Sequence, residues 1–334
     1  MTQRIWSRRD LLYAAGAAGL VGAAPTLAAG EPPPETTRLR VGGGTTLCFA
    51  PQFVAEELLR AEGFNQVEFV QRTPEGSSVA LLGAGEADIS LTLTPNALIG
   101  MDAGQPVVLL AGGHVGCYEL FARRQIHAIR DLKGKVVSIP RWGGGSHLFL
   151  QMIFSNIGID PRKGVEWRLD RWADVPPLLE EEKIDAYLGF PPEPQELRAR
   201  KIGHVIFNTR ADRPWSQYFC CMVGANREFV RKHPVATKRA LRAILKGIDL
   251  CAAEPERSAR AAAAHRPAAK YEYVLQMVKD LRYGTWRDFS AEDTVRFFAL
   301  RLREIGMIKS NPQKLLTAGT DWRFIDQLRK ELKT

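Results

Sequence analysis

The sequence predicts an α/β protein with two similar lobes and a helical C-terminal part. Short apolar runs alternate with amphipathic segments from Arg38 onward, which is the pattern of parallel strands covered by helices. The same succession starts again at Lys135, and the chain beyond Arg227 has helical periodicity almost throughout. Of the 334 residues, 45% are apolar and 25% are charged. This average amino-acid composition excludes a disordered, collagenous or coiled-coil chain. The length suits two domains.

The first 29 residues are expected to be an export signal. A basic start containing Arg8 and Arg9 precedes the Ala/Gly/Leu stretch Leu11–Leu27, and this layout is similar to a twin-arginine signal peptide. The alternative is a membrane anchor, but the stretch is poor in bulky apolar residues and shorter than the roughly 20 residues that a span needs. We therefore expect a periplasmic protein, with residues 30–37 as a Pro-rich extended tether.

The first half opens with a strand, a loop and a helix. Leu39–Val41 is a short apolar run that predicts a strand, Gly42–Gly44 predicts a loop, and residues 51–62 carry apolar side chains at helical spacing. Strand and helix then alternate through 67–70, 77–82, 88–91, 95–103 and 107–111.

The second half repeats this order. Residues 135–139 predict a strand, Gly143–Gly145 a loop, and the following residues a helix to about Ile157. Each half also has a strand that begins at an aspartate, Asp88 or Asp185, and ends in a Pro-containing loop. Because ligands bind at the carboxyl ends of strands in open α/β sheets, the cleft between the lobes is the natural site. The remaining elements are expected at 165–169, 175–182, 186–188, 194–200, 205–207 and 219–224, with helices at 234–253, 270–281, 291–305 and 322–332.

Four segments resemble a known family: Ala50–Glu57, Asp131–Lys135, Gly144–His147 and Gly189–Pro194. They look like substrate-binding proteins of ABC importers of the nitrate/sulfonate/taurine type, which share their fold with the thiamine-pyrimidine-precursor family. The resemblance extends over roughly residues 36–330.

The resemblance implies a two-lobe periplasmic-binding-protein fold of type II with a central ligand cleft. The chain would cross between the lobes near 123–130 and again near 212–219, so that lobe 1 comprises 38–123 and 218–334 and lobe 2 comprises 124–217. The lobes would close on a small molecule and present a docking surface to a membrane permease with its ATPase.

A glycine loop in the second lobe is the strongest candidate for ligand binding. Gly144, Gly145, Ser146 and His147 open a helix, where free N–H groups and the helix dipole favour an anion. Ser146 can cap the helix or donate to an oxyanion. The alternative is a plain turn with a serine N-cap.

The first lobe supplies further candidates around its loops. Phe49 could cover a ligand face and Gln52 could hydrogen-bond the ligand, but both also suit a core phenylalanine and a helix cap. The polar residues after the third strand suit ordinary turns equally well, and a lone histidine is more often structural. These candidates are Cys48, Phe49, Gln52, Thr92, Thr94 and His114.

The second lobe and its return segment add four more candidates. Trp142 could form a cleft wall, and Phe190 lies in the loop after the third strand of this lobe. Glu193 could accept an amine, since a carboxylate in a poorly hydrated cleft is costly unless it is paired; a glutamate stabilised by a helix dipole is the alternative. Tyr218 could close over the ligand or pack the hinge.

Other functions find little support. The five cysteines include no C-x-x-C pair, and Cys220 and Cys221 on one strand would point to opposite faces, so neither a metal nor another cofactor is expected. Gly144–Leu148 lacks the final glycine of a G-x-S-x-G nucleophile elbow, and we expect no catalytic residue. The net charge is +9, but the basic residues do not form a stripe interleaved with aromatic residues. Nucleic acid is therefore not an expected partner.

We therefore expect a monomeric periplasmic solute-binding component of an ABC importer. Its ligand would be a small anionic or zwitterionic compound similar to a sulfonate, nitrate or taurine. The alternatives are an enzyme of the thiamine-pyrimidine-precursor synthase type, whose fold is the same, and a sensory binding protein.

Overall fold

The structure is a computed structural model that describes residues 30–43, 46–71 and 78–332. The expected export signal, residues 1–29, lies outside the described residues. No helix in the described part of the chain is long and apolar enough to cross a membrane.

The first sheet has five strands in the order β2-β1-β3-β10-β4. Strand β1 is parallel to β2 and β3, whereas β10 is antiparallel to both β3 and β4. The apolar residues of the strands account for the order, since β3, β4 and β10 are buried along nearly their whole length and occupy the centre or the helix-covered edge of the sheet. The strands are β1 (Arg38–Gly42), β2 (Gln66–Val70), β3 (Ile89–Leu93), β4 (Val107–His114) and β10 (Cys221–Asn226).

The second sheet repeats the topology of the first, with the order β7-β6-β8-β5-β9. Here β6 is parallel to β7 and β8, and β5 is antiparallel to both β8 and β9. In each sheet the antiparallel strand, β10 or β5, is the one that arrives from the other sheet. The predicted repetition of two α/β halves is therefore confirmed. The strands are β5 (Glu119–Ala122), β6 (Val136–Ile139), β7 (Glu166–Leu169), β8 (Ala186–Gly189) and β9 (His204–Asn208).

Two chain segments cross between the sheets, and the first does so earlier than expected. Residues 119–122 pair with β8 and β9, so the first crossing is 115–118 and not 123–130. A four-residue strand is too short to show a period in the sequence. The second crossing, 209–220, includes the expected segment, and the two crossings are joined because the N–H of Tyr118 donates to Thr209 Oγ1 and the N–H of Thr209 donates to the Tyr118 carbonyl, each over 3.0 Å.

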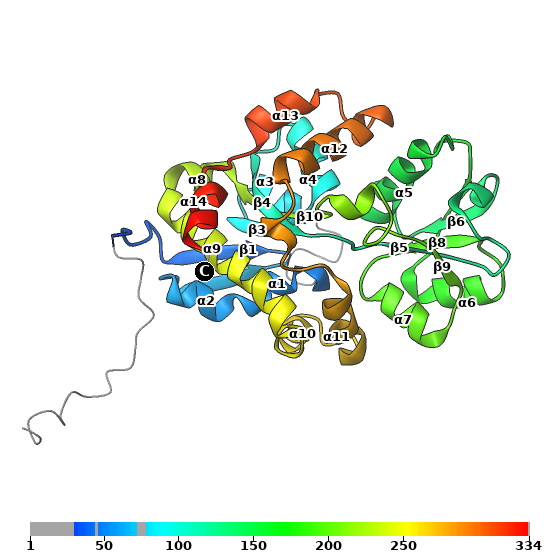
Figure 1. The fold of residues 1–334 in the computed structure, drawn as a ribbon, viewed down its shortest axis with the longest axis horizontal. Coiled ribbons are helices and arrows are strands. Elements are labelled where there is room, and N and C mark those ends of the chain that lie inside the picture. The colour runs from blue at the N-terminus through cyan, green and yellow to red at the C-terminus, as the bar shows by residue number, and fades with distance from the viewer. Residues whose placement is uncertain (1–29, 44–45, 72–77, 333–334) are drawn as a thin grey trace, which may run out of the picture. The chain divides into compact units, whose positions relative to one another are not determined.

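Helices cover both sheets (Figure 1). The helix expected over 51–62 is divided at Ala55 into two short helices. The first sheet carries η1 (Leu47–Phe49), α1 (Ala50–Val54), α2 (Glu56–Ala61), α3 (Ser78–Gly83) and α4 (Thr94–Asp102), and the second carries η2 (Ile129–Leu132), α5 (Gly145–Asn156), η3 (Trp172–Asp174), α6 (Val175–Glu180) and α7 (Glu193–Arg200).

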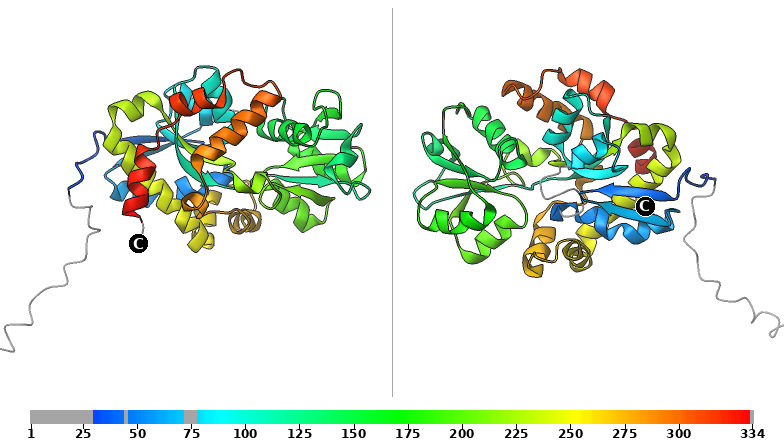
Figure 2. Two further views of the ribbon diagram at one scale, coloured as in Figure 1. Left: turned by 45° about the horizontal axis from the view of Figure 1, so that its top comes forward. Right: turned by 180° about the vertical axis from the view of Figure 1, so that it is seen from behind.

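The C-terminal part is helical, as predicted, and Figure 2 shows it gathered around the first sheet. One of its helices, α11, also contacts the second lobe, because Asp280 accepts a hydrogen bond from Gln195 of α7 over 3.0 Å and pairs with Arg198. These elements are α8 (Arg227–Lys232), α9 (Pro234–Ala253), α10 (Pro255–Ala264), α11 (Tyr271–Asp280), η5 (Thr285–Arg287), α12 (Ala291–Glu304), α13 (Pro312–Gly319) and α14 (Arg323–Glu331), preceded by η4 (Trp215–Gln217) in the second crossing.

The two aspartates singled out by the internal repeat have the same structural role. Asp88 Oδ2 accepts the N–H of Arg40 at the start of the first sheet over 2.7 Å, and Asp185 Oδ2 accepts the N–H of Val136 in the second sheet over 2.8 Å. Each aspartate thereby joins two parallel strands at their amino ends. The loops at the opposite, carboxyl ends are left to form a site.

Candidate ligand-binding site

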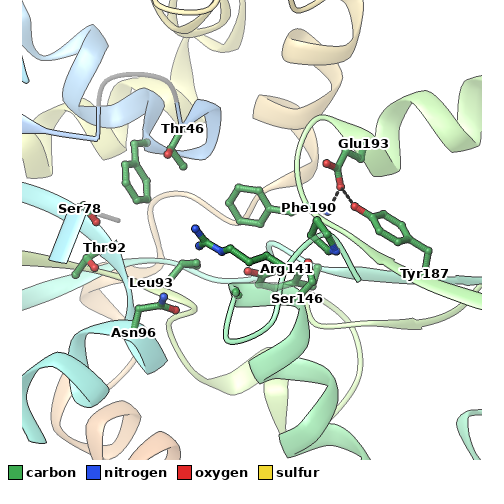
Figure 3. A pocket seen from close by; sticks show the side chains of 15 residues that line it. Thr46, Ser78, Thr92, Leu93, Asn96, Arg141, Ser146, Tyr187, Phe190 and Glu193 are labelled. Carbon is green, nitrogen blue, oxygen red and sulfur yellow. Dashed lines mark hydrogen bonds between the residues drawn. The ribbon is translucent and has the colours of Figure 1, made fainter. Parts of the chain in front are cut away.

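A cavity of about 660 Å³ is lined by residues of both sheets. Its size is typical of a pocket for a small molecule. Figure 3 shows polar side chains entering it from both sides. The lining residues are Thr46, Phe49, Ser78, Thr92, Leu93, Asn96, Tyr118, Pro140, Arg141, Gly144, Gly145, Ser146, Tyr187, Phe190 and Glu193.

The glycine loop forms the wall at the N-terminus of α5. Gly144 is the N-cap residue and has no side chain with which to cap the helix, so the alternative of a serine N-cap is wrong. Ser146 is buried and lines the cavity together with Gly144 and Gly145. A Cβ on Gly145 would lie 2.1 Å from the Tyr118 hydroxyl, and only glycine allows this close approach. The first-turn N–H groups of α5 therefore belong to the cavity wall, which is the arrangement that binds anions.

Of the residues beside this loop, Arg141 lines the cavity, whereas His147 and Trp142 lie outside its lining. Arg141 is exposed and extends its guanidinium into the cavity (Figure 3). His147 does not line the cavity: its Nδ1 accepts the N–H of Gly143 over 3.0 Å, and burial lowers its pKa to about 4. The neutral imidazole holds the loop in place. Trp142 is 53% exposed, packs edge to face on His147 and lies outside the lining.

The carboxylate of Glu193 is held at one side of the cavity. Its Oε2 accepts the hydroxyl of Tyr187 over 2.7 Å and the N–H of Phe190 over 3.0 Å (Figure 3). Burial raises the pKa of Glu193 to about 7, although both hydrogen bonds act in the opposite direction. The group can therefore change its protonation state near neutral pH, and it suits either a neutral donor or a carboxylate paired with a cation.

The first lobe presents two polar atoms that lack partners among the described residues. Thr92 Oγ1 and Asn96 Oδ1 are buried, no hydrogen bond to either is found within residues 30–43, 46–71 and 78–332, and both residues line the cavity. A buried polar group without a partner costs roughly 1–3 kcal/mol. A ligand in the cavity could supply the missing hydrogen bonds. Phe49 also lines the cavity.

Several candidate residues lie elsewhere and have structural contacts. Gln52 connects β1 to β3, because its Nε2 donates to the Gly42 carbonyl over 2.6 Å and its Oε1 accepts the N–H of Leu91 over 3.0 Å. Thr94 Oγ1 donates to the Phe219 carbonyl over 2.8 Å. Tyr218 stacks on Phe297 with ring centroids 4.0 Å apart. None of these three side chains lines the cavity.

Cys48 and His114 also lie outside the lining, in a buried thiol cluster. The expectation that Cys220 and Cys221 point to opposite faces is wrong, since their sulfur atoms are 3.9 Å apart. Strand β10 begins only at Cys221, and its pairing with β4 shifts register after that residue, so strict alternation does not apply to the pair.

Two tyrosines that were not predicted from the sequence, Tyr118 and Tyr187, also line the cavity. Tyr118 lies in the first crossing, where its ring contacts Phe149 and Phe190, and a tyrosine in an unassigned segment carries no signal. Tyr187 lies within the apolar run of β8. Its position next to an expected cleft loop was the one available indication.

Comparisons with known proteins agree with this geometry. The profile of the family described as NMT1/THI5 like matches residues 49–258. No curated protein sequence matches the chain.

The solved structures that resemble the chain include nitrate-binding and sulfonate-binding proteins. The periplasmic nitrate-binding protein NrtA from Synechocystis PCC 6803 is 16% identical over 90% of each chain, with a TM-score of 0.73. The periplasmic aliphatic sulphonate binding protein SsuA from Escherichia coli is 15% identical over 81% of this chain and 86% of its own, with a TM-score of 0.64. The alkanesulfonate-binding protein SsuA from Xanthomonas axonopodis pv. citri, bound to MOPS, is 13% identical over 83% and 96%, with a TM-score of 0.64. The expected periplasmic-binding-protein fold is confirmed.

Proposed function

The chain belongs to the NMT1/THI5-like family, and on this basis we propose that it is the solute-binding component of an ABC importer. It captures a small anionic or zwitterionic compound in the cavity and delivers it to a membrane permease. The observation that carries the proposal is the pair of unpartnered polar atoms, Thr92 Oγ1 and Asn96 Oδ1, in a cavity whose other wall is the uncapped N-terminus of α5.

The chemistry of the two walls favours an oxyanion such as a sulfonate, nitrate or carboxylate. The N–H groups at the start of α5 and the guanidinium of Arg141 favour negative charge. Thr92 can donate a hydrogen bond, whereas Asn96 Oδ1 can only accept one. Glu193 adds a second acceptor. A ligand with an anionic group and a separate donor, such as an amine, satisfies all of these atoms.

Capture by closure follows from the two-sided lining. A ligand that contacts both walls binds the closed form more tightly than an open one, so it shifts the population toward closure. The crossings 115–118 and 209–220 are the segments about which this motion would take place. Residues 1–29 are proposed to direct export through the twin-arginine route to the periplasm.

Mass spectrometry of material that co-purifies with the chain tests the function directly. It is followed by thermal-shift measurements with nitrate, taurine, alkanesulfonates and small carboxylates. A true ligand at about 100 times its Kd adds about 2.7 kcal/mol to the free energy of unfolding. Stabilisation by at least one anion, with the solute recovered unchanged, is expected.

Two results would contradict the proposal. A solute recovered in chemically altered form would favour an enzyme of the same fold. Stabilisation that persists unchanged in the variant Ser146→Ala combined with Arg141→Ala would mean that the solute binds elsewhere.

A further inference from the structure

Four cysteines and one histidine meet in the interior beside the cavity. Cys48 lies in η1, His114 ends β4, Cys117 lies in the first crossing, and Cys220 and Cys221 lie where the second crossing enters β10. All five side chains are buried. The ligand atoms of Cys48, His114, Cys117 and Cys221 lie within 4.8 Å of one another.

The spacing of these atoms suits a tetrahedral ion. On zinc, two sulfur ligands lie about 3.8 Å apart and a sulfur and a nitrogen about 3.6 Å apart, since Zn–S is about 2.3 Å and Zn–N about 2.0–2.1 Å. The sulfur of Cys117 is 3.7 Å from that of Cys221 and 3.8 Å from His114 Nδ1. The sulfur of Cys220 is 3.6 Å from the same nitrogen.

Cys220 is a neighbour of this set. Its sulfur is 2.9 Å from that of Cys117, which is longer than the about 2.05 Å of a disulfide and shorter than the edge of a zinc tetrahedron. These two sulfurs are therefore too close together for both to be ligands of the same ion. Cys117 lies within reach of all three other ligands, and Cys220 is its possible substitute.

Tyr283 packs against two members of this cluster. The His114 ring is held edge-on against Tyr283, and its Nδ1 lies 3.8 Å from the sulfur of Cys117. Tyr283 in turn donates its hydroxyl to the Cys48 carbonyl over 3.0 Å, so one residue orients two of the ligands. The set contains thiols and an imidazole and no carboxylate, a donor set that selects thiophilic ions over magnesium or calcium.

We propose that Cys48, His114, Cys117 and Cys221 bind one Zn²⁺ ion, which joins the two chain crossings to η1, the short helix that carries Phe49. Each thiol releases its proton to solvent on binding, and no electron is transferred. Cys117 lies in the first crossing, Cys221 directly follows the second, and Cys48 precedes the cavity residue Phe49. The ion would therefore stiffen the hinge and the ligand wall together.

The test uses the full chain without an affinity tag, purified with a mild chelator to remove loosely held metal. Elemental analysis is expected to find one zinc per chain. His114→Gln and Cys48→Ser should lose the metal, because neither ligand has a substitute. Cys251→Ser is the matched control, since Cys251 is equally buried but lies outside the cluster on α9, and it should keep the full zinc content.

A second measurement keeps the test decisive if a variant fails to fold. Replacement of zinc by Co²⁺ in the unmodified chain should give thiolate-to-cobalt charge-transfer bands and the visible bands of a tetrahedral site. A metal-free chain with five titratable thiols would overturn the proposal. A metal-free chain with three would also overturn it and would assign a disulfide to Cys117 and Cys220. Metal content does not depend on the solute, so this result is independent of the proposed transport function.

Discussion

Tyr187 donates a hydrogen bond to Glu193 across 2.7 Å, and the same carboxylate oxygen accepts the N–H of Phe190. The two donors fix the carboxylate at the cavity wall. Even so, burial raises the pKa of Glu193 to about 7. The carboxyl group of Glu193 can therefore gain or lose a proton when a ligand binds near neutral pH.

Glu193→Gln should reduce the pH dependence of stability. The folded state holds a proton on Glu193 up to about pH 7, whereas the unfolded chain releases it near pH 4.5. Stability is therefore highest below the unfolded pKa and falls as the pH rises toward 7, by at most about 3 kcal/mol. Glutamine keeps an acceptor for Tyr187 and Phe190 but cannot ionise, so this fall should disappear.

Urea unfolding at about pH 5 and about pH 8 measures this effect. Glu57→Gln serves as the control, because the Glu57 side chain is 80% exposed in its pair with Arg257, and it should keep the pH profile of the unmodified chain. If the free energy of unfolding changes by the same amount between the two pH values in the Glu193 variant and in the unmodified chain, the pKa of Glu193 is not raised by folding.

Thr92→Val should weaken solute binding without destabilising the empty protein. Valine has nearly the same shape and removes a buried hydroxyl that has no hydrogen-bond partner in the described part of the chain, so the free energy of unfolding should stay the same or rise by about 1 kcal/mol. The affinity for the solute should fall about tenfold if the hydroxyl contributes about 1.4 kcal/mol to binding. Calorimetric titration and thermal unfolding measure the two quantities.

Thr94→Val is the matched control two residues away. Its hydroxyl donates to the Phe219 carbonyl, so the substitution leaves a buried acceptor unpaired and should cost roughly 1–3 kcal/mol of stability. Thr92 and Thr94 are both fully buried, and opposite effects on stability would identify the hydroxyl that serves the ligand. Equal losses of stability would contradict the interpretation.

Gly145→Ala should clash with Tyr118. The added Cβ would lie 2.1 Å from the tyrosine hydroxyl, and overpacking of this kind costs typically about 1–3 kcal/mol. Tyr118→Phe removes the clashing atom, so the alanine substitution should cost less in that background. A double-mutant cycle by urea unfolding measures the coupling, and additive costs would mean that the loop moves away from Tyr118.

Local patterns in the sequence were sufficient for the repeated order of strands and helices. Apolar runs with intervening helical periodicity mark the parallel strands, because both signals arise from neighbours in the chain. Asp88 and Asp185 could also be matched to each other in the repeat, but the structure was needed to find that they accept hydrogen bonds from the N–H groups of Arg40 and Val136. The glycine loop at Gly144 could likewise be assigned to the start of a helix.

Only the tertiary structure decided which side chains meet. Gln52 and Thr94 follow cleft-facing strands, yet hydrogen bonds direct them to β1, β3 and Phe219, whereas Tyr118 reaches the cavity from a crossing with no periodicity. Cys48 and Cys221 are far apart in the sequence and meet because β10 is inserted between β3 and β4. Sequence periodicity indicates which face of a helix or strand is buried. Which side chains meet in the folded protein depends instead on the order of the strands and on where the chain crosses between the two sheets.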